Sequence, residues 1–112
     1  MYARILEFVP KMEKRMDVVN AVNNEVIPIL RKQKGFLDAL VLLQINSDKV
    51  VGFSLWVEKT YAEPFERKWF PQVQEMLKPY LAAPITVHYY MVESALGGVF
   101  NRATPERRRN AS

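Results

Sequence analysis

The chain has 112 residues, no cysteine, a hydrophobic fraction of 49% and a formal net charge of +4 at pH 7. This length corresponds to one domain, and this hydrophobic fraction excludes disorder of the whole chain. The absence of cysteine excludes disulfides, thiolate nucleophiles and cysteine-based zinc sites, and we expect a reducing, cytoplasmic location.

The first predicted elements are a strand and a long helix. Residues 2–9 are rich in β-branched and aromatic side chains, which predicts a strand that Pro10 ends. Between residues 11 and 34, apolar residues recur with the 3.6-residue period of an amphipathic helix. Pro28 lacks a backbone donor, so we expect the last helical turns to bend or break there. Gly35 then supplies a left-handed helix stop.

Two apolar runs, residues 37–46 and 49–58, follow the helix and are joined by Ser47-Asp48. Their spacing predicts a hairpin with a tight turn, although the strongest turn pair, Asn-Gly, is absent. Thr60 and Glu63 then have the spacing of a capping box, which predicts a helix with Thr60 as its N-cap.

The second helical region carries two stripes. An aromatic stripe at four-residue intervals is formed by Tyr61, Phe65 and Trp69. An apolar stripe follows at Val73, Met76, Leu77, Tyr80 and Leu81. Pro71 is suited to open the second part of this region, and Pro79 and Pro84 end it. Residues 85–93 are predicted to form the last strand.

The predicted order is therefore βαββαβ. This order indicates an α+β, ferredoxin-like fold: a four-stranded antiparallel sheet with its helices on one face. We assign residues 1–93 to this domain. Residues 94–112 contain Gly97-Gly98 and an arginine-rich end, and we expect them to form a basic, mobile C-terminal extension.

Both faces of the predicted sheet are apolar. Side chains alternate between the faces of a strand, which places Leu37 with Ala39 and Val41, and Leu40 on the other face. Along residues 49–58 and 85–93, both alternating sets are also largely apolar. Exposing a second apolar face costs roughly 25 cal/mol per Å². We therefore expect a homodimer in which two sheets pack face to face.

The positive charge lies mostly in the extension. Residues 94–112 hold four arginines and one glutamate, a balance of +3, which leaves +1 for residues 1–93. The RNA-recognition motif has the same βαββαβ order, and residues 51–57 echo its third-strand pattern. Its base-stacking positions are here Val51, Phe53 and Leu55, two of them aliphatic, so we expect no nucleic-acid partner. No stretch approaches the roughly 18 apolar residues of a membrane span, so we expect no membrane partner.

Three segments carry a resemblance to a known family: Val26–Arg31 with Gly35-Phe36, Ser54–Glu58, and Val87–Val92. Over residues 2–93 the chain resembles the antibiotic biosynthesis monooxygenase-like domains of the dimeric α/β-barrel superfamily. The resemblance implies a homodimer with a cavity between sheet and helices in each subunit. Some members oxidise aromatic polyketides or quinols with dioxygen and no cofactor, others degrade haem, and many have no assigned activity.

Trp56 matches a pocket tryptophan of the family at the end of the third strand. Gly52 and Ser54 share its face, and these small residues leave space for a cavity. Trp56 either stacks on a flat substrate or fills the gap itself. The family's oxygenases often carry an asparagine where this chain has Gly52. Haem-degrading relatives use a helix histidine, whereas the one histidine here, His88, lies in a predicted strand.

His88 is the candidate catalytic base, because its pKa lies near neutrality and cofactor-free oxygenation needs a substrate anion that passes an electron to dioxygen. The alternative is a hydrogen-bonded strand histidine. Arg4, a charge in an apolar strand, either pairs with Glu7 or Glu58 or holds a substrate anion.

Three aromatic residues complete the set of candidate substrate-binding residues: Phe65, Trp69 and Tyr89. The stripe to which Phe65 and Trp69 belong is expected to roof the cavity as well as to fill the core. A single strand histidine without cysteine does not make a metal site, and we expect no cofactor.

The functional hypothesis is a cofactor-independent monooxygenase that oxidises a phenolic, quinol or anthrone-type aromatic with dioxygen. Trp56 and His88 are its candidate catalytic residues, and the expected partners are a second copy of the chain and a small aromatic molecule. The alternatives are a dimeric module that binds a small ligand without catalysis and a haem-degrading relative.

Overall fold

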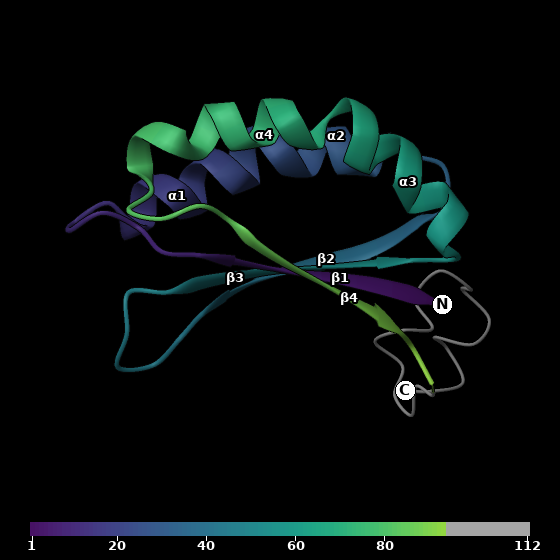
Figure 1. Ribbon diagram of the computed structural model, residues 1–112, viewed down its shortest axis with the longest axis horizontal. Helices are drawn as coiled ribbons and strands as arrows, with labels where there is room; N and C mark the ends of the chain where they lie inside the picture. Colours follow the sequence, from purple (N-terminus) through teal and green to yellow (C-terminus); the bar gives the residue numbers. More distant parts are fainter. Residues whose placement is uncertain (94–112) are drawn as a thin grey trace.

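The computed structural model describes residues 1–93, which fold into one helical layer on one four-stranded sheet (Figure 1). The strands are β1 (Tyr2–Phe8), β2 (Phe36–Leu43), β3 (Val50–Trp56) and β4 (Thr86–Met91). The first crossover contains α1 (Arg15–Ala21), the π-helix η1 (Val22–Val26) and α2 (Ile27–Arg31). The second contains α3 (Lys59–Lys68), α4 (Phe70–Leu77) and the 3₁₀ turn η2 (Lys78–Tyr80).

The sheet has the strand order β2-β3-β1-β4, and every neighbouring pair is antiparallel. Both crossovers lie on the same face of the sheet (Figure 1). This is the ferredoxin-like α+β arrangement that the sequence predicts. The expected boundary after residue 93 and the expected mobile extension lie outside the described residues.

Pro28 shapes the first crossover, as its position in the sequence predicts. The helix passes into a π-helical turn, in which the backbone N–H of Ile27 bonds to the carbonyl oxygen of Val22, five residues earlier. Because Pro28 has no N–H, it cannot close the usual bond to residue 24, and a wider turn accommodates this loss. The helix begins at Arg15 rather than Lys11, because Glu13 has a positive φ of 64° and holds a turn there.

Gly35 ends this crossover with a φ of +81°, as expected for a left-handed stop. Its carbonyl oxygen accepts the N–H of Val57 at 2.8 Å, so the glycine also links the start of β2 to the end of β3. A Cβ at this position would overlap the ring of Tyr61 on α3.

Two local predictions were wrong. The β2–β3 turn is wider than Ser47-Asp48: the strands separate after Leu43, and Asn46 takes a positive φ of 63°. Thr60 is not an N-cap, because α3 begins at Lys59 and no side chain caps it. A bulge between Phe36 and Asp38 shifts the register of β2, so that Phe36 pairs with Trp56 and Asp38 pairs with Leu55.

The core lies between the helices and the sheet. Val18, Val50, Trp56, Ala62 and Leu77 are fully buried there. On the outer face of the sheet, large apolar side chains remain exposed: 43% for Leu40, 48% for Leu42 and 50% for Tyr90. The expected second apolar face is therefore present. No helix within residues 1–93 is long and apolar enough to cross a membrane.

We predict that Gly35→Ala lowers the free energy of unfolding by about 2–4 kcal/mol. The alanine would need a strained positive φ and would overlap the Tyr61 ring. Urea unfolding followed by circular dichroism measures the loss. Lys32→Ala, an exposed change in the same segment, is the control and should stay within about 0.5 kcal/mol of the wild type. Equal stability of the two variants would contradict the assignment.

Candidate active site

Arg4 occupies the middle of β1 on the face that the helices cover, and only 1% of its surface is exposed. Its guanidinium carbon lies 4.9 Å from the centre of the Phe70 ring and 5.8 Å from the centres of the Phe65 and Tyr89 rings. The charge is thus held among three aromatic side chains by cation–π attraction. Burying a cation is costly unless an anion accompanies it.

Glu66 on α3 supplies that anion. Its Oε2 lies 2.8 Å from Arg4 Nε and also accepts a hydrogen bond of 3.1 Å from the Tyr2 hydroxyl. The Arg4 contact is an ion pair whose N–H is not aligned as a hydrogen bond, and Arg4 Nη2 is buried without a hydrogen-bond partner. The prediction that Arg4 pairs with Glu7 or Glu58 was wrong, because the helix above β1 presents Glu66 instead.

The Tyr2 ring stacks on the Tyr89 ring, with 6.3 Å between centroids and 25° between planes. Burial, and then the negative charge of Glu66 and the hydrogen bond to it, raise the pKa of the Tyr2 hydroxyl well above its ordinary range. Tyr2 therefore remains protonated near neutral pH and acts as a hydrogen-bond donor to Glu66.

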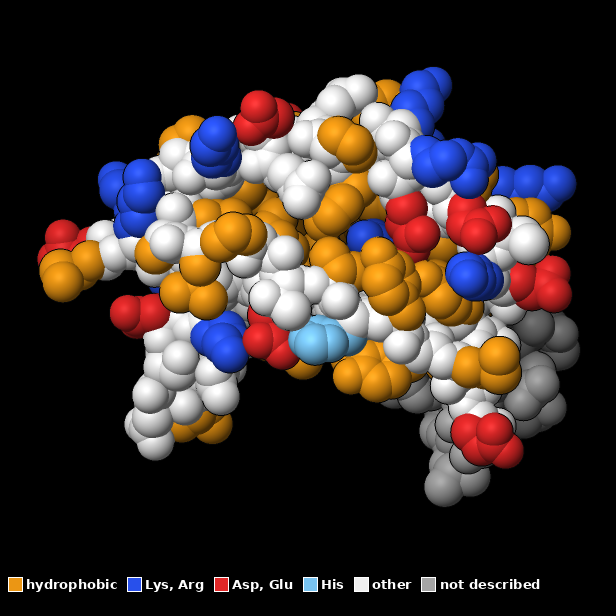
Figure 2. Space-filling view, viewed as in Figure 1, with side chains coloured by type: hydrophobic (Ala, Val, Ile, Leu, Met, Phe, Trp, Pro, Cys, Tyr) orange, Lys and Arg blue, Asp and Glu red, His pale blue; other side chains and the backbone are white. Residues whose placement is uncertain are grey.

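A small cavity of about 40 Å³ adjoins Arg4 between the helices and the sheet. Gly52 and Ser54 line it, as their small size predicts, together with Phe65 and Phe70 from the second crossover. Figure 2 shows apolar side chains gathered along the seam between the helical layer and the sheet, with charged side chains around them.

Trp56 lies beside this region but is completely buried. Its Nε1 donates a hydrogen bond of 3.1 Å to Ser54 Oγ, and its ring contacts Phe36 edge-on and Phe65 at a tilt. Phe36 and Phe65 therefore cover the Trp56 ring in this structure. The residue supports Phe65, which in turn contacts Arg4.

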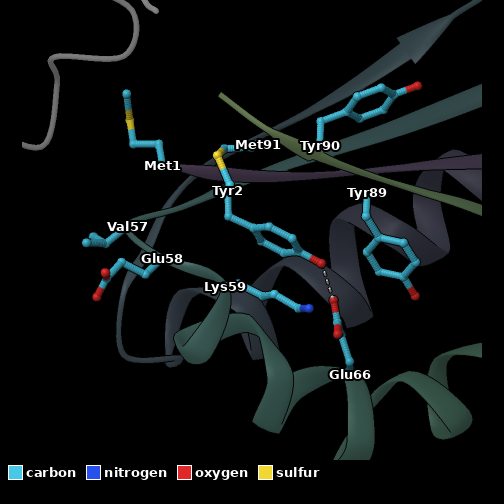
Figure 3. A pocket seen from close by; sticks show the side chains of 9 residues that line it. All are labelled: Met1, Tyr2, Val57, Glu58, Lys59, Glu66, Tyr89, Tyr90 and Met91. Atoms are coloured by element: carbon cyan, nitrogen blue, oxygen red, sulfur yellow. Dashed lines mark hydrogen bonds between the residues drawn. The ribbon is translucent and has the colours of Figure 1, made fainter. Parts of the chain in front are cut away.

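An open groove of about 620 Å³ lies on the other side of Glu66. It is lined by Met1, Tyr2, Val57, Glu58, Lys59, Glu66, Tyr89, Tyr90 and Met91. Figure 3 shows the Tyr2 hydroxyl and the Glu66 carboxylate facing each other, with the Tyr89 ring beside them. Tyr89, a predicted substrate-binding residue, therefore lines the groove, and Glu66 joins the groove to buried Arg4.

His88 does not lie at this site. It pairs with Ile5 across the sheet, on the face opposite Arg4 and Trp56, and its Nε2 is 3.3 Å from Glu7 Oε2. Glu7 Oε1 accepts a hydrogen bond of 3.1 Å from Lys49 Nζ, and this bond, followed by the charges of Lys49 and His88, lowers the pKa of Glu7. The structure therefore does not bring His88 and Trp56 together.

Of the predicted aromatic stripe, only Phe65 reaches the cavity. Tyr61 packs over Gly35, and Trp69 is partly exposed with Lys68 Nζ 5.2 Å from its ring centre. Phe70, and not Trp69, lines the cavity and lies beside Arg4.

Sequence reasoning missed Glu66, Phe70 and Tyr2. One signal was available for Glu66: a lone arginine under a helix requires an acid from that helix, and Glu66 directly follows core residue Phe65. Within residues 1–93, no three histidine, aspartate or glutamate side chains lie close enough to hold a metal ion.

Comparison with solved structures identifies many proteins of the same fold. A monooxygenase from Streptomyces coelicolor, ActVA-Orf6, in complex with nanaomycin D, matches with a TM-score of 0.73 and 19% identity over 85% of this chain and 89% of that one. SnoaB, a cofactor-independent oxygenase from Streptomyces nogalater, matches with a TM-score of 0.70 and 11% identity over 85% and 95%. Rv0793 from Mycobacterium tuberculosis matches with a TM-score of 0.70 and 13% identity, over 86% of this chain and 98% of that one. No protein-family model and no curated protein sequence matches the chain. At these identities the comparison shows a shared fold.

We predict that Arg4→Met and Glu66→Gln each lower the free energy of unfolding by about 2–4 kcal/mol, because each leaves the other group buried without its partner. The double variant should lose less than the sum of the two, by about 2 kcal/mol. Urea unfolding of all four proteins measures this coupling. Asp17→Asn, which breaks the exposed pair with Lys14, is the control and should cost less than about 0.5 kcal/mol. Additive losses at Arg4 and Glu66 would show that the pair is not coupled.

Proposed function

We propose that the protein is a cofactor-independent monooxygenase that oxidises a phenolic, quinol or anthrone-type aromatic with dioxygen. One observation carries the proposal: the buried Arg4 guanidinium has an Nη2 without a hydrogen-bond partner, lines the small cavity, and is paired with Glu66, which lines the open groove. The fold supports it, because neighbours with this architecture include enzymes described as a monooxygenase and as a cofactor-independent oxygenase.

In this proposal the aromatic lies in the groove against the rings of Tyr2 and Tyr89. Glu66 is the carboxylate that reaches both the groove and Arg4, so it takes the acidic proton of the substrate. Arg4 then stabilises the substrate anion, which is electron-rich enough to reduce dioxygen. His88 is replaced as the base by Glu66, because it lies on the opposite face of the sheet.

Trp56 acts in this proposal through Phe65 rather than by touching the substrate. Its bond to Ser54 and its contact with Phe65 fix the ring that covers Arg4. The residue is therefore a positioning residue, and its loss should lower turnover through a less ordered Arg4.

We also propose that two copies pack through their outer sheet faces. The exposed side chains Leu40, Leu42 and Tyr90 lie there with the partly buried Ile5 and Phe53. An apolar surface of this kind is favourable only when covered. A second copy offers the same surface and can satisfy it by two-fold symmetry.

We predict that the protein consumes oxygen with at least one member of a panel of quinols and anthrones, and that Arg4→Met lowers kcat/KM about 100-fold or more. Arg4→Lys should recover only part of the activity, because lysine keeps the charge but loses the planar fork. Arg67→Met, which removes an exposed arginine from the same helix as Glu66, is the matched control and should leave uptake unchanged.

The same assay is applied to Trp56→Ala and Glu66→Gln, with circular dichroism to confirm folding. Both should lower kcat more than they raise KM, because neither is expected to hold the ring of the substrate. Absence of uptake with every compound, combined with retained binding of an aromatic, would favour the non-catalytic module. A shifted Soret band on titration with haem would favour the haem-degrading alternative.

We predict that the wild-type protein sediments with the mass of a dimer at micromolar concentration. Leu40→Asp should raise the dimer Kd about 100-fold or more, because it places a charge inside an apolar interface. Met12→Asp replaces an equally apolar but 85% exposed side chain away from the sheet, and it should leave the mass unchanged. A monomer mass for the dilute wild type would contradict the proposed assembly.

A further inference from the structure

The Glu66 carboxylate, which lines the groove, is held by two contacts that use the same oxygen atom. Arg4 Nε lies 2.8 Å from Oε2, and the Tyr2 hydroxyl donates a hydrogen bond of 3.1 Å to that oxygen. Within residues 1–93, the other oxygen, Oε1, has no hydrogen-bond partner, and it is not a buried atom. Oε1 is therefore the carboxylate oxygen that is open to a ligand in the groove.

The two contacts constrain the carboxylate in different ways. The Arg4 contact is an ion pair without an aligned hydrogen bond, so it supplies opposite charge but little direction. The bond from Tyr2 is directional, and its donor is fixed in place, because the Tyr2 ring is buried and stacks on the Tyr89 ring. Tyr2 is thus the residue that sets the direction in which Oε1 points.

The groove offers a ligand two kinds of contact (Figure 3). One is an apolar rim, in which the lining side chains are between 41% and 86% exposed: Met1, Val57, Tyr90 and Met91. A ligand that covers this rim needs apolar surface, which an aromatic ring provides. The other contact is Oε1 of Glu66, and an ionised carboxylate only accepts hydrogen bonds. An aromatic ring with a free hydroxyl satisfies both contacts, whereas its methyl ether satisfies only the first.

We propose that Tyr2 is a positioning residue that, together with Arg4, holds Oε2 of Glu66 and so presents Oε1 to the hydroxyl group of an aromatic ligand. The inference rests on the proposed function and deepens it, because it names the group that the groove recognises and the atom that takes the proton. In that reaction the O–H bond of the substrate breaks, its proton passes to Oε1, and the electron pair stays on the substrate oxygen as a phenolate. The groove therefore selects a free hydroxyl over an ether.

The test measures equilibrium binding rather than turnover, in the full-length protein. Its two ligands are 2-naphthol and 2-methoxynaphthalene, which share one ring system and are both neutral. The charges of Glu58 and Lys59, which also line the groove, therefore affect them alike. Fluorescence titration gives the two dissociation constants. The wild type should bind 2-naphthol about tenfold more tightly or better, because only 2-naphthol can donate a charge-assisted hydrogen bond to Glu66.

Tyr2→Phe is the decisive variant, because it keeps the ring that stacks on Tyr89 and removes only the hydroxyl. The preference for 2-naphthol should fall to about threefold or less, while binding of 2-methoxynaphthalene stays unchanged. A purely structural role of Tyr2 would instead weaken both ligands equally. Tyr80→Phe removes the hydroxyl of a partly buried tyrosine outside the groove and should keep the full preference. Glu66→Gln should also lower the preference, and circular dichroism checks that each variant is folded.

The outcomes separate this inference from the function on which it rests. Equal affinities for the two ligands, no binding of either, or a preference that Tyr2→Phe leaves intact would overturn the role of Tyr2 even if the protein oxidises quinols. A preference that is lost in Tyr2→Phe and kept in Tyr80→Phe would support it even if no compound in the panel is oxidised, and the proposed oxygenase activity would then fail alone.

Discussion

The positive charge of Arg4, buried under the helical layer, is the constraint on which the rest of the site depends. A guanidinium at this depth requires an anion and polarisable neighbours, and the structure supplies Glu66 and three aromatic rings. These partners come from α3, α4 and β4, so one side chain of β1 fixes how the second crossover and the edge strand sit on the sheet. Arg4 lines the small cavity, and its partner Glu66 lines the groove.

The fold could be predicted from the sequence because the patterns that determine it are local or periodic. Alternation, helical spacing and the conformations required at Pro28 and Gly35 act within a few residues, and the structure agrees with them. The ends of the helices and strands were harder to predict. The start of α3 at Lys59 and the bulge before Asp38 both depend on how β2 pairs with β3. No pattern within a few residues of the sequence contains that pairing.

The candidate site could be predicted from the sequence only in part. Arg4 stood out because a charge in an apolar strand is expensive wherever it points. Its partner Glu66 is 62 positions away, and only the packing of α3 over β1 brings them together. Alternation shows that His88 and Tyr89 lie on opposite faces of β4, but it does not show which face the helices cover when both are apolar. Because of this ambiguity, the sequence-based hypothesis placed His88 at the same site as Trp56, whereas in the structure the two side chains lie on opposite faces of the sheet.

The π-helical turn in the first crossover has an evolutionary consequence. Such a turn holds one residue more than an α-helical turn, so a single-residue deletion within Val22–Val26 could convert it to regular helix. That deletion would rotate the preceding helix relative to the following one by about 100°. Because Val22, Val26 and Leu30 line the small cavity beside Arg4, the loss or gain of one codon here would reshape that cavity without a change in the sequence of the sheet.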